Sequence, residues 1–421
     1  MEYGLIGEHL PHSFSKEIHG RCADYDYQLT ELTPEQVSEF MTAKEFKAIN
    51  VTIPYKQTVI PFLSYLDESA TSIGAVNTVV NRDGELYGYN TDFYGMEALI
   101  RRMGISLTGK KVLILGTGGT SRTAQGVAKS AKAGQVVVVG RSPDPSRVTY
   151  GEMYEAHTDG QIIINTTPCG MYPHADGAPD RGATAVDLSK FPNLQGVVDV
   201  VYNPLRTNFV MDAKDRGLPA EGGLYMLVAQ AVKACRIFQG KDFDGMDEQT
   251  DEIYREILSQ KENIVLTGMP GSGKSTVGKR LAAALHRPFI DTDEEIVKQA
   301  GKEIPQIFSE VGEGGFRDLE SDVIRRIANQ SIGAVIATGG GGILRDENVR
   351  ALKRTGRLYF LDRSLGALLP TADRPLASSA EAIRKRYEER YGRYRATCDV
   401  RVAIDEEIQH TVEFIRKDFF A

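Results

Sequence analysis

The 421-residue sequence contains no tryptophan and only four cysteines, which are Cys22, Cys169, Cys235 and Cys398. The cysteines form no C-x-x-C pair, so neither a disulfide framework nor a zinc site of the usual spacing is predicted. No run of eighteen apolar residues occurs, and the first residues lack a basic start followed by a long apolar stretch. We therefore expect neither a transmembrane helix nor a signal peptide, and we predict a cytoplasmic protein with reduced thiols.

Positive charge is also in deficit, because the formal net charge is −7. This balance argues against nucleic acid as a partner, since nucleic acid attracts basic surfaces. The lack of a long apolar run argues against a membrane. Any anionic small-molecule substrate must then be held by local cationic side chains. Hydrophobic residues make up 41% and charged residues 25% of the chain, which is ordinary for a globular protein of about three compact units. Nothing in the sequence predicts an oligomeric state.

Glycine is abundant instead, with 42 residues, or about a tenth of the chain against a usual ~7%. Short apolar runs precede many of these glycines. The runs are KVLILG (111–116), VVVVG (136–140), QIIINTT (161–167), GVVDVVY (196–202), NIVLTG (263–268), AVIATGG (334–340) and RLYFLD (357–362). Runs that are apolar throughout are typical of parallel strands covered on both faces, and the helical stretches between them predict α/β architecture twice. The charged segment 240–263 between the two sets predicts a linker that ends in an amphipathic helix.

The sharpest motif is GMPGSGKST at 268–276, which fits G-x-x-x-x-G-K-[ST] between an expected strand and an expected helix. The backbone amides of such a loop wrap a phosphate at a helix N-terminus, while the lysine reaches the β- and γ-phosphates and the serine hydroxyl binds Mg²⁺. A purely structural turn has no use for Lys-Ser after its last glycine. The predicted ATP-binding residues are Gly271, Ser272, Gly273, Lys274, Ser275 and Thr276, and we expect Lys274 to be catalytic.

Three further patterns lie downstream of this loop. Asp291 and Asp293 follow a short apolar run, so both carboxylates are expected at a strand end facing the nucleotide, with a helix N-cap as the alternative. Arg317 and Glu320 are three residues apart and share a helix face, whether as a site or as a surface ion pair. The glycines 339–342 follow an expected strand, where backbone can approach a ligand closely or form a flexible hairpin.

With these motifs in place, residues 262–421 resemble shikimate kinase, a small nucleoside-monophosphate-kinase-like enzyme. The matching words are GMPGSGKST, DTD, GEGGFR-x-x-E, GGGG, DRPL and a later R-x-x-x-Y. The resemblance implies that shikimate is bound by Asp293, Arg317, Gly340, Gly341 and Arg390. It also implies that Asp293 orients or deprotonates the acceptor hydroxyl, that Ser275 and Asp291 serve Mg²⁺, and that Arg374 is a lid arginine over the ATP phosphates. The wording RYGRY departs from the usual R-x-P-L-Y, so Arg386 and Arg393 compete with Arg390 for its role.

The N-terminal half carries a looser glycine motif, GTGGTS at 116–121, between an expected strand and an expected helix. This is a loose form of the dinucleotide-binding fingerprint. About twenty residues on, the next strand ends in Gly140, Arg141 and Ser142, where a site for NAD usually shows an acidic residue. A guanidinium suits the 2′-phosphate of NADP, and a serine can add a hydrogen bond. We therefore predict NADP rather than NAD; a solvated loop charge is the alternative for Arg141.

Two charged residues stand just beyond two expected strands further upstream. In AINVTIP (48–54) apolar and polar residues alternate, which predicts a strand that has Ile53 on its apolar face and ends at the proline. Lys56 follows this strand, and Asp92 follows the strand-like segment 85–92. They can form one catalytic pair if the strands are neighbours. On the residues alone, two solvated loop charges are the better interpretation.

The wider resemblance favours the pair. Residues 1 to about 247 resemble shikimate dehydrogenase through the words GEHLPHSFS, NVTIPYK, GAVNT, GYNTD, GTGGTS, INTTPCGM, DVVYNP and GGLYMLVAQA. The resemblance implies that Lys56 and Asp92 are catalytic and that the substrate is bound by Ser13, Ser15, Thr52, Lys56, Asn77, Asp92, Tyr202 and Gln230. The NADP-binding residues that it implies, together with the glycine motif, are Gly116, Gly118, Gly119, Thr120, Ser121, Gly140, Arg141, Ser142, Gly223 and Met226.

The sequence thus predicts a bifunctional enzyme of the shikimate pathway that uses NADP(H), ATP and Mg²⁺. The first half would reduce 3-dehydroshikimate to shikimate, and the second would phosphorylate shikimate to shikimate 3-phosphate. The alternative is a quinate/shikimate dehydrogenase fused to a regulatory module or a related small-molecule kinase. The expected architecture is α/β: a substrate lobe (1–97 and 222–247), a Rossmann NADP lobe (98–221), a linker helix (248–261) and a P-loop kinase domain (262–421).

Overall fold

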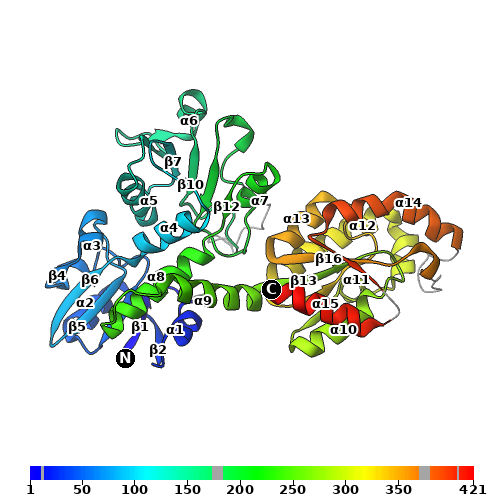
Figure 1. Ribbon diagram of the computed structural model, residues 1–421, viewed down its shortest axis with the longest axis horizontal. Coiled ribbons are helices and arrows are strands. Elements are labelled where there is room, and N and C mark those ends of the chain that lie inside the picture. Colours follow the sequence, from blue (N-terminus) through cyan, green and yellow to red (C-terminus); the bar gives the residue numbers. More distant parts are fainter. Residues whose placement is uncertain (11–13, 173–183, 369–379, 405–406) are drawn as a thin grey trace. The chain divides into compact units, whose positions relative to one another are not determined.

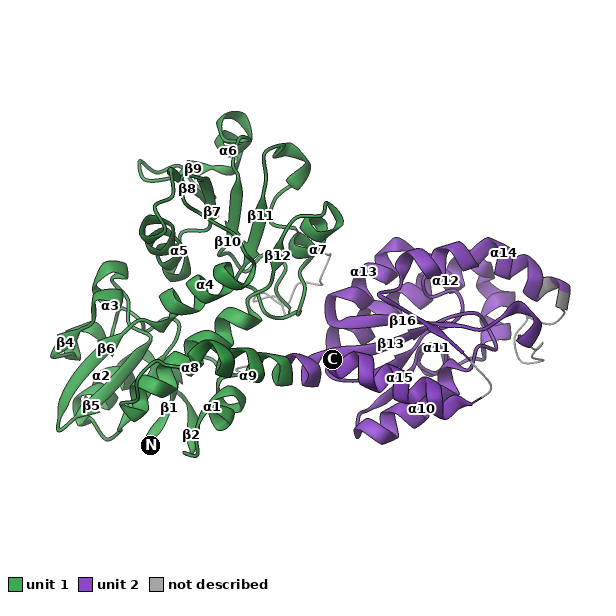
Figure 2. Cartoon of the chain, viewed as in Figure 1, with its two compact units in different colours: residues 1–257 green, residues 258–421 purple. Residues whose placement is uncertain are grey.

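The computed structural model describes residues 1–10, 14–172, 184–368, 380–404 and 407–421. The chain forms two compact units, residues 1–257 and 258–421 (Figure 2). Two predicted site residues, Ser13 and Arg374, lie outside the described residues. Among the described residues, no helix combines the length and the apolar character that crossing a membrane requires.

The first unit begins with a mixed six-stranded sheet in the order β2-β1-β3-β5-β6-β4 (Figure 1). Strands β1, β2 and β3 are parallel, while β5 runs antiparallel to both β3 and β6. The strands are β1 (Tyr3–Gly7), β2 (Tyr27–Glu31), β3 (Ala48–Val51), β4 (Tyr65–Leu66), β5 (Thr78–Arg82) and β6 (Glu85–Tyr89). The helices of this part are α1 (Ser15–Cys22), α2 (Pro34–Ala43) and α3 (Glu68–Ile73).

A second six-stranded sheet in this unit is parallel throughout, in the order β12-β11-β10-β7-β8-β9. Counted along the chain this is the order 3-2-1-4-5-6 of the dinucleotide-binding fold, so the predicted Rossmann lobe is confirmed. Its strands are β7 (Lys111–Leu115), β8 (Gln135–Gly140), β9 (Val148–Thr149), β10 (Ile162–Asn165), β11 (Gly196–Asp199) and β12 (Ala220–Glu221). Its helices are α5 (Gly119–Ser130), α6 (Tyr150–Ala156) and α7 (Asn208–Asp215). Most of the apolar strand residues are buried, as expected where helices cover both faces.

Two helices join the sheets of the first unit. Helix α4 (Thr91–Arg102) leads from the first sheet to the second, α8 (Leu224–Gln239) leads back, and the two pack side by side (Figure 1). Helix α9 (Met246–Lys261) follows, beginning two residues before the expected 248. The expected lobe boundary at 97 falls inside α4, so this helix serves both lobes. The finer division of the chain stays a prediction.

The second unit is built on a parallel five-stranded sheet in the order β14-β15-β13-β16-β17. Its strands are β13 (Asn263–Thr267), β14 (Phe289–Asp291), β15 (Val335–Ala337), β16 (Gly356–Asp362) and β17 (Val400–Ala403). Its helices are α10 (Lys274–Leu285), α11 (Thr292–Ala300), α12 (Ile304–Gln330), α13 (Asp346–Thr355), α14 (Ala380–Thr397) and α15 (Ile408–Phe420). Helix α12 is kinked at Gly312, which has φ +71°. The predicted strand, loop and helix around 268–276 are confirmed by β13 and α10.

One sequence expectation is wrong in its detail. Strand β3 ends at Val51, and Ile53, expected on the apolar face of a strand running to the proline, is 73% exposed. Backbone pairing explains the early end, because β1 pairs with β3 only as far as Val51 and β5 only as far as Asn50. The turn that follows carries Lys56 away from the sheet.

Candidate active sites

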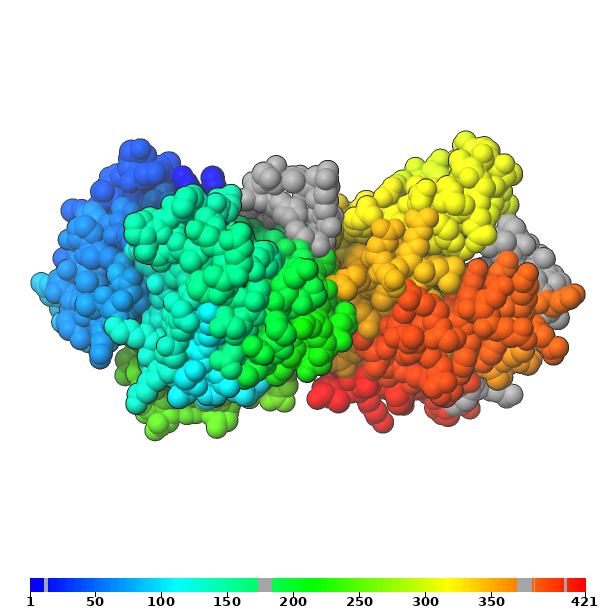
Figure 3. All heavy atoms as spheres, turned by 90° about the horizontal axis from the view of Figure 1, so that it is seen from above, coloured from blue at the N-terminus to red at the C-terminus, as the bar shows by residue number. Residues whose placement is uncertain are grey.

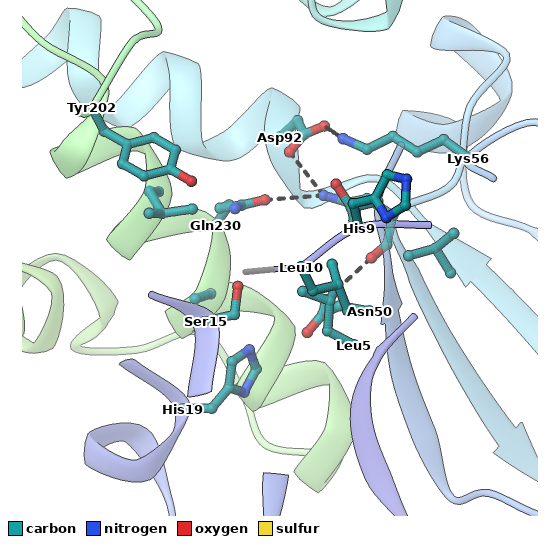
Figure 4. Close-up of a pocket in the computed structure, with 15 residues that line it drawn as sticks. Leu5, His9, Leu10, Ser15, His19, Asn50, Lys56, Asp92, Tyr202 and Gln230 are labelled. Carbon is teal, nitrogen blue, oxygen red and sulfur yellow. Dashed lines mark hydrogen bonds and ion pairs between the residues drawn. The ribbon is translucent and has the colours of Figure 1, made fainter. Parts of the chain in front are cut away.

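Lys56 and Asp92 form an ion pair, with the lysine Nζ 2.5 Å from Asp92 Oδ2 (Figure 4). Strands β3 and β6 are not neighbours, because β5 lies between them. The pair forms nevertheless, since Asp92 stands in the first turn of α4, where the helix dipole favours a carboxylate. The lysine side chain is 21% exposed and the aspartate 9%. The pair is therefore poorly screened by solvent, while the lysine remains accessible to a substrate.

Asn77, immediately before β5, holds the other carboxylate oxygen of Asp92. Its Nδ2 lies 2.9 Å from Asp92 Oδ1 and 3.1 Å from Gln230 Oε1, and its Oδ1 accepts the backbone N–H of Thr91 at 2.8 Å. Gln230 comes from α8, so these contacts join the first sheet, α4 and α8. Asn77 is 3% exposed, and such a buried network fixes the aspartate in one orientation.

A cavity of about 320 Å³ opens beside this network. The predicted substrate residues that line it are Ser15, Thr52, Lys56, Asn77, Asp92, Tyr202 and Gln230. Tyr202 follows β11, so the cavity receives side chains from both sheets, and Figure 4 shows Lys56 and Asp92 on one side and Ser15 on another. The structure brings together every predicted residue of this site that it describes. Their individual roles stay predictions.

The cavity also has lining residues that the sequence analysis did not select. They include Asn50, whose Oδ1 accepts from Tyr27 Oη at 2.7 Å, and His19, whose Nδ1 is 2.6 Å from Tyr25 Oη. Burial lowers the pKa of His19 to about 3, so its imidazole is neutral near pH 7. Asn50 could have been found from its place beside Thr52 on the polar face of AINVT. His19 gave no such signal, because its neighbours come together only in the fold.

A second cavity, of about 800 Å³, lies at the carboxyl ends of β7, β8 and β10. Of the predicted NADP-binding residues, Gly116, Gly118, Gly140 and Arg141 line it. Gly116 has φ +110°, and a Cβ there would stand 2.7 Å from Thr166 Oγ1, so only glycine lets the backbone form this edge. Cavity and backbone together fit a dinucleotide at the switch point of the sheet. Thr166, Thr167, Tyr150 and Met171 also line it and were not selected from the sequence.

The 2′-phosphate corner predicted at Arg141 and Ser142 contains a second cation. Arg147 donates from Nε to Ser142 O at 3.0 Å, and its Cδ is 2.8 Å from where a Cβ of Gly140 would stand. The sequence analysis overlooked Arg147, since the intervening turn hides its proximity. Two guanidinium groups at this corner suit a dianionic phosphate.

The other predicted NADP-binding residues do not line this cavity. Gly119, Thr120 and Ser121 lie in the first turn of α5. Gly223 caps α8, and a Cβ there would overlap Val200 O. Met226 is buried, and its backbone carbonyl lies against Gly95 of α4.

The phosphate loop of the second unit has the backbone that the motif predicts. Gly268, Gly271 and Gly273 have φ of +151°, +80° and +92°. Lys274 Nζ donates to the carbonyls of Gly268 and Met269 at 2.8 and 3.0 Å, which holds the ammonium over the loop. The buried Oγ of Ser272 has no hydrogen-bond partner among the described residues, as expected of a group aimed at a phosphate.

The predicted Mg²⁺ ligands meet beside this loop. Ser275 Oγ donates to Asp291 Oδ2 at 2.6 Å. Asp291 also caps α11, because its Oδ1 accepts the backbone N–H of Asp293 at 3.0 Å. The N-cap alternative is therefore confirmed for Asp291, and its role as a Mg²⁺ ligand stays a prediction. A hydroxyl and a carboxylate at this spacing fit the oxygen ligands that Mg²⁺ prefers.

Arg317 and Glu320 form a buried ion pair, with Nη1 2.7 Å from Glu320 Oε2 and exposed fractions of 8% and 1%. The predicted common helix face is confirmed, and the surface-pair alternative is wrong. Burial raises the pKa of Glu320, and the charge of Arg317 partly offsets this rise. A Cβ on Gly341 would overlap the guanidinium of Arg317, and one on Gly339 would overlap Asp293 Oδ1. The glycine run 339–342 therefore lets these side chains reach its backbone closely.

Arg390 reaches the same glycines from α14, since its Nη1 donates to Gly340 O at 3.1 Å. Tyr394 Oη donates to the same carbonyl at 2.6 Å. The competitor Arg393 is engaged elsewhere, because it donates from Nε to Ile343 O at 2.9 Å and pairs with Asp346. Arg317 and Arg390 thus converge on the glycines that follow β15, beside Asp293, where an anionic acceptor can be held.

Two sites of different chemistry follow from this geometry. The first combines a dinucleotide cavity with a lysine–aspartate pair, which are the site features of an NADP-type oxidoreductase. The second combines a phosphate loop, a predicted Mg²⁺ ligand pair and an arginine cluster, which are the site features of a P-loop kinase.

Comparisons with known proteins agree with this class. Residues 5–79 match the family model for the shikimate dehydrogenase substrate binding domain, and residues 270–418 match that for shikimate kinase. Shikimate dehydrogenase (NADP(+)) of Clostridium perfringens strain 13 is 37% identical over 273 residues, which cover 61% of this chain and 97% of the relative. The crystal structure of shikimate dehydrogenase 1 from Peptoclostridium difficile is 34% identical, with a TM-score of 0.54, over 61% of this chain and 97% of that chain. The crystal structure of the shikimate dehydrogenase from Thermus thermophilus, in complex with NADP(H) and shikimate, is 27% identical, with a TM-score of 0.52. The match covers 60% of this chain and 99% of that chain.

Over its N-terminal part this chain belongs to the shikimate dehydrogenase family, and its C-terminal part carries a shikimate kinase domain. The predicted families, fold class and enzyme classes are confirmed. The expected cofactors NADP(H), ATP and Mg²⁺ are those of the two enzyme families.

Proposed function

We propose that this chain catalyses two successive reactions on one small ring acid: reduction of 3-dehydroshikimate to shikimate with NADPH, and transfer of the γ-phosphoryl group of ATP to shikimate with Mg²⁺. The Lys56–Asp92 pair in a cavity of about 320 Å³ carries the first proposal. The second rests on Arg317 and Arg390 meeting beside Asp293. A cytoplasmic location stays a prediction.

In the first reaction NADPH supplies the hydride when bound. Lys56 donates a proton to the carbonyl oxygen as that oxygen gains charge, and Asp92 holds the ammonium in place. Asn77, itself bonded to Gln230, keeps the aspartate fixed, so the lysine meets the substrate in one geometry.

In the second reaction ATP with Mg²⁺ supplies the phosphoryl group when bound. Lys274 neutralises charge at the phosphates, and Asp293 accepts a hydrogen bond from the acceptor hydroxyl and orients its oxygen. Arg317 and Arg390 bind the carboxylate of the ring acid. The hydroxyl formed in the first reaction is the acceptor in the second, so both sites act on one oxygen atom in turn.

A coupled assay on the full chain tests this proposal. Purified protein is given 3-dehydroshikimate, NADPH, ATP and Mg²⁺, and both NADPH consumption and shikimate 3-phosphate are measured. Lys56→Met should stop the first step while added shikimate is still phosphorylated, and Lys274→Met should leave reduction intact. Each variant is therefore the folding control for the other.

Three outcomes would count against the proposal. Reduction without any phosphorylation would make the second unit a regulatory module. Phosphorylation of other acceptors at equal kcat/KM would point to a related small-molecule kinase. Oxidation of quinate as fast as shikimate, or equal use of NAD, would favour the broader quinate/shikimate enzyme.

A further inference from the structure

The two arginines at the kinase acceptor site have a third arginine beside them. Arg386 stands four residues before Arg390 on α14, so both side chains leave the same helix face, one turn apart. Arg390 reaches Gly340, and the guanidinium of Arg317 lies against Gly341 from the opposite helix, α12. Arg386 therefore stands one helical turn from Arg390, whose guanidinium, like that of Arg317, contacts the glycines after β15.

One buried nitrogen of the Arg386 guanidinium, Nη1, lacks a hydrogen-bond partner within the part of the chain that the structure describes. Burial and the like charges of Arg390 and Arg317 lower the pKa of this guanidinium, while Glu313 and Glu389 act in the opposite direction.

Two carboxylates beside Arg317 are already in use. Glu320 and Glu313 both pair with Arg317, at 2.7 and 3.3 Å. An unmade hydrogen bond on a buried N–H of a cation is costly, and an anion that enters the cluster removes that cost. A carboxylate suits this position, since it accepts several guanidinium hydrogen bonds at once.

We propose that Arg386 is a third carboxylate-binding residue of the kinase acceptor site and, with Arg317 and Arg390, selects ring acids that carry a free carboxylate. This inference rests on the proposed kinase function. It predicts that the site discriminates strongly against the same ring when its carboxylate is esterified, because three cations would then face a neutral group.

The experiment measures steady-state phosphorylation by full-length Arg386→Leu, with shikimate and with its methyl ester. The matched control is Arg384→Leu, which removes the same charge from an exposed position of α14, a helix that forms part of the surface in Figure 3 (orange-red). Loss of a hydrogen bond to a charged group predicts a rise in KM for shikimate of about 10-fold or more, with KM for ATP unchanged. Arg386→Lys should recover part of this loss. With the methyl ester, Arg386→Leu and the wild type should be equal.

The remaining outcomes decide against the inference. A KM for shikimate within about 2-fold of the wild type would overturn it, because a charge-assisted contact contributes more than that. An equal rise in KM of Arg386→Leu with shikimate and with the methyl ester would also overturn it, because it would show a general change of structure. If Arg386→Leu fails to fold, Arg386→Gln carries the same comparison. If the wild type does not phosphorylate shikimate, the proposed function itself fails, a result that the variants do not affect.

Discussion

Lys56→Met is the sharpest test of the reductase chemistry. The substitution keeps most of the side-chain length but removes the group whose Nζ lies 2.5 Å from Asp92 Oδ2. General acid catalysis contributes about 10²- to 10⁴-fold to a rate, so we expect kcat for reduction to fall by about that factor. KM for 3-dehydroshikimate should change by less than about 3-fold, because Ser15, Asn77 and Gln230 still line the cavity.

The same substitution has a cost in stability. Breaking a buried ion pair costs about 3–5 kcal/mol, but the Lys56 side chain is 21% exposed. In the variant Asp92 also retains its hydrogen bond from Asn77 and its favourable interaction with the dipole of α4. We therefore expect a loss of about 1–2 kcal/mol for the first unit, which leaves it folded.

The assay follows NADPH absorbance over a range of 3-dehydroshikimate concentrations, with shikimate phosphorylation by the same sample as internal control. Lys47→Met is the matched control, since that side chain is 60% exposed and its ion pair is with the exposed Glu2. An unchanged kcat with a raised KM would refute the proton-donor role. Lys56 would then only bind the substrate, and water would supply the proton.

Three further predictions address other parts of the chain. Gly341→Ala should displace the flexible Arg317 guanidinium without unfolding the protein and raise KM for shikimate in the kinase reaction about 10- to 100-fold, measured with the reductase as control. Arg141→Ala should raise KM for NADP about 10- to 100-fold and leave KM for NAD unchanged, measured by initial rates with each cofactor; equal effects on both would contradict the 2′-phosphate role. The folded-state pKa of His19 is about 3 against 6.5 when unfolded, so its contribution to stability is complete above pH 6.5 and is lost as the pH falls toward 3. In this window the free energy of unfolding of the wild type should therefore fall by up to about 1.4 kcal/mol per pH unit more than that of His19→Gln, measured by urea unfolding of the first unit. An equal pH dependence of the two unfolding free energies would contradict this prediction.

Much of the chemistry is local in sequence, and the sequence alone determined it. The phosphate loop 268–276 is a continuous turn whose glycines, lysine and serine act through backbone geometry, so its position and strand–loop–helix context follow from spacing. The same holds for Arg317 and Glu320, which the helical repeat places on one face. The apolar strands between glycine clusters likewise predicted two α/β units.

Contacts between distant segments depended on tertiary structure. The residues Lys56 and Asp92 follow strands that are separated by a third, and only the turn after β3 and the start of α4 bring their side chains together. Arg147 approaches Ser142 through a turn that spacing does not describe, and His19 meets Tyr25 in a buried cluster with no periodic signal. Patterns in a sequence report backbone geometry over a few residues, whereas the distance between two loops is set by the packing of whole elements. That packing alone decided which charged groups face each other across each cavity.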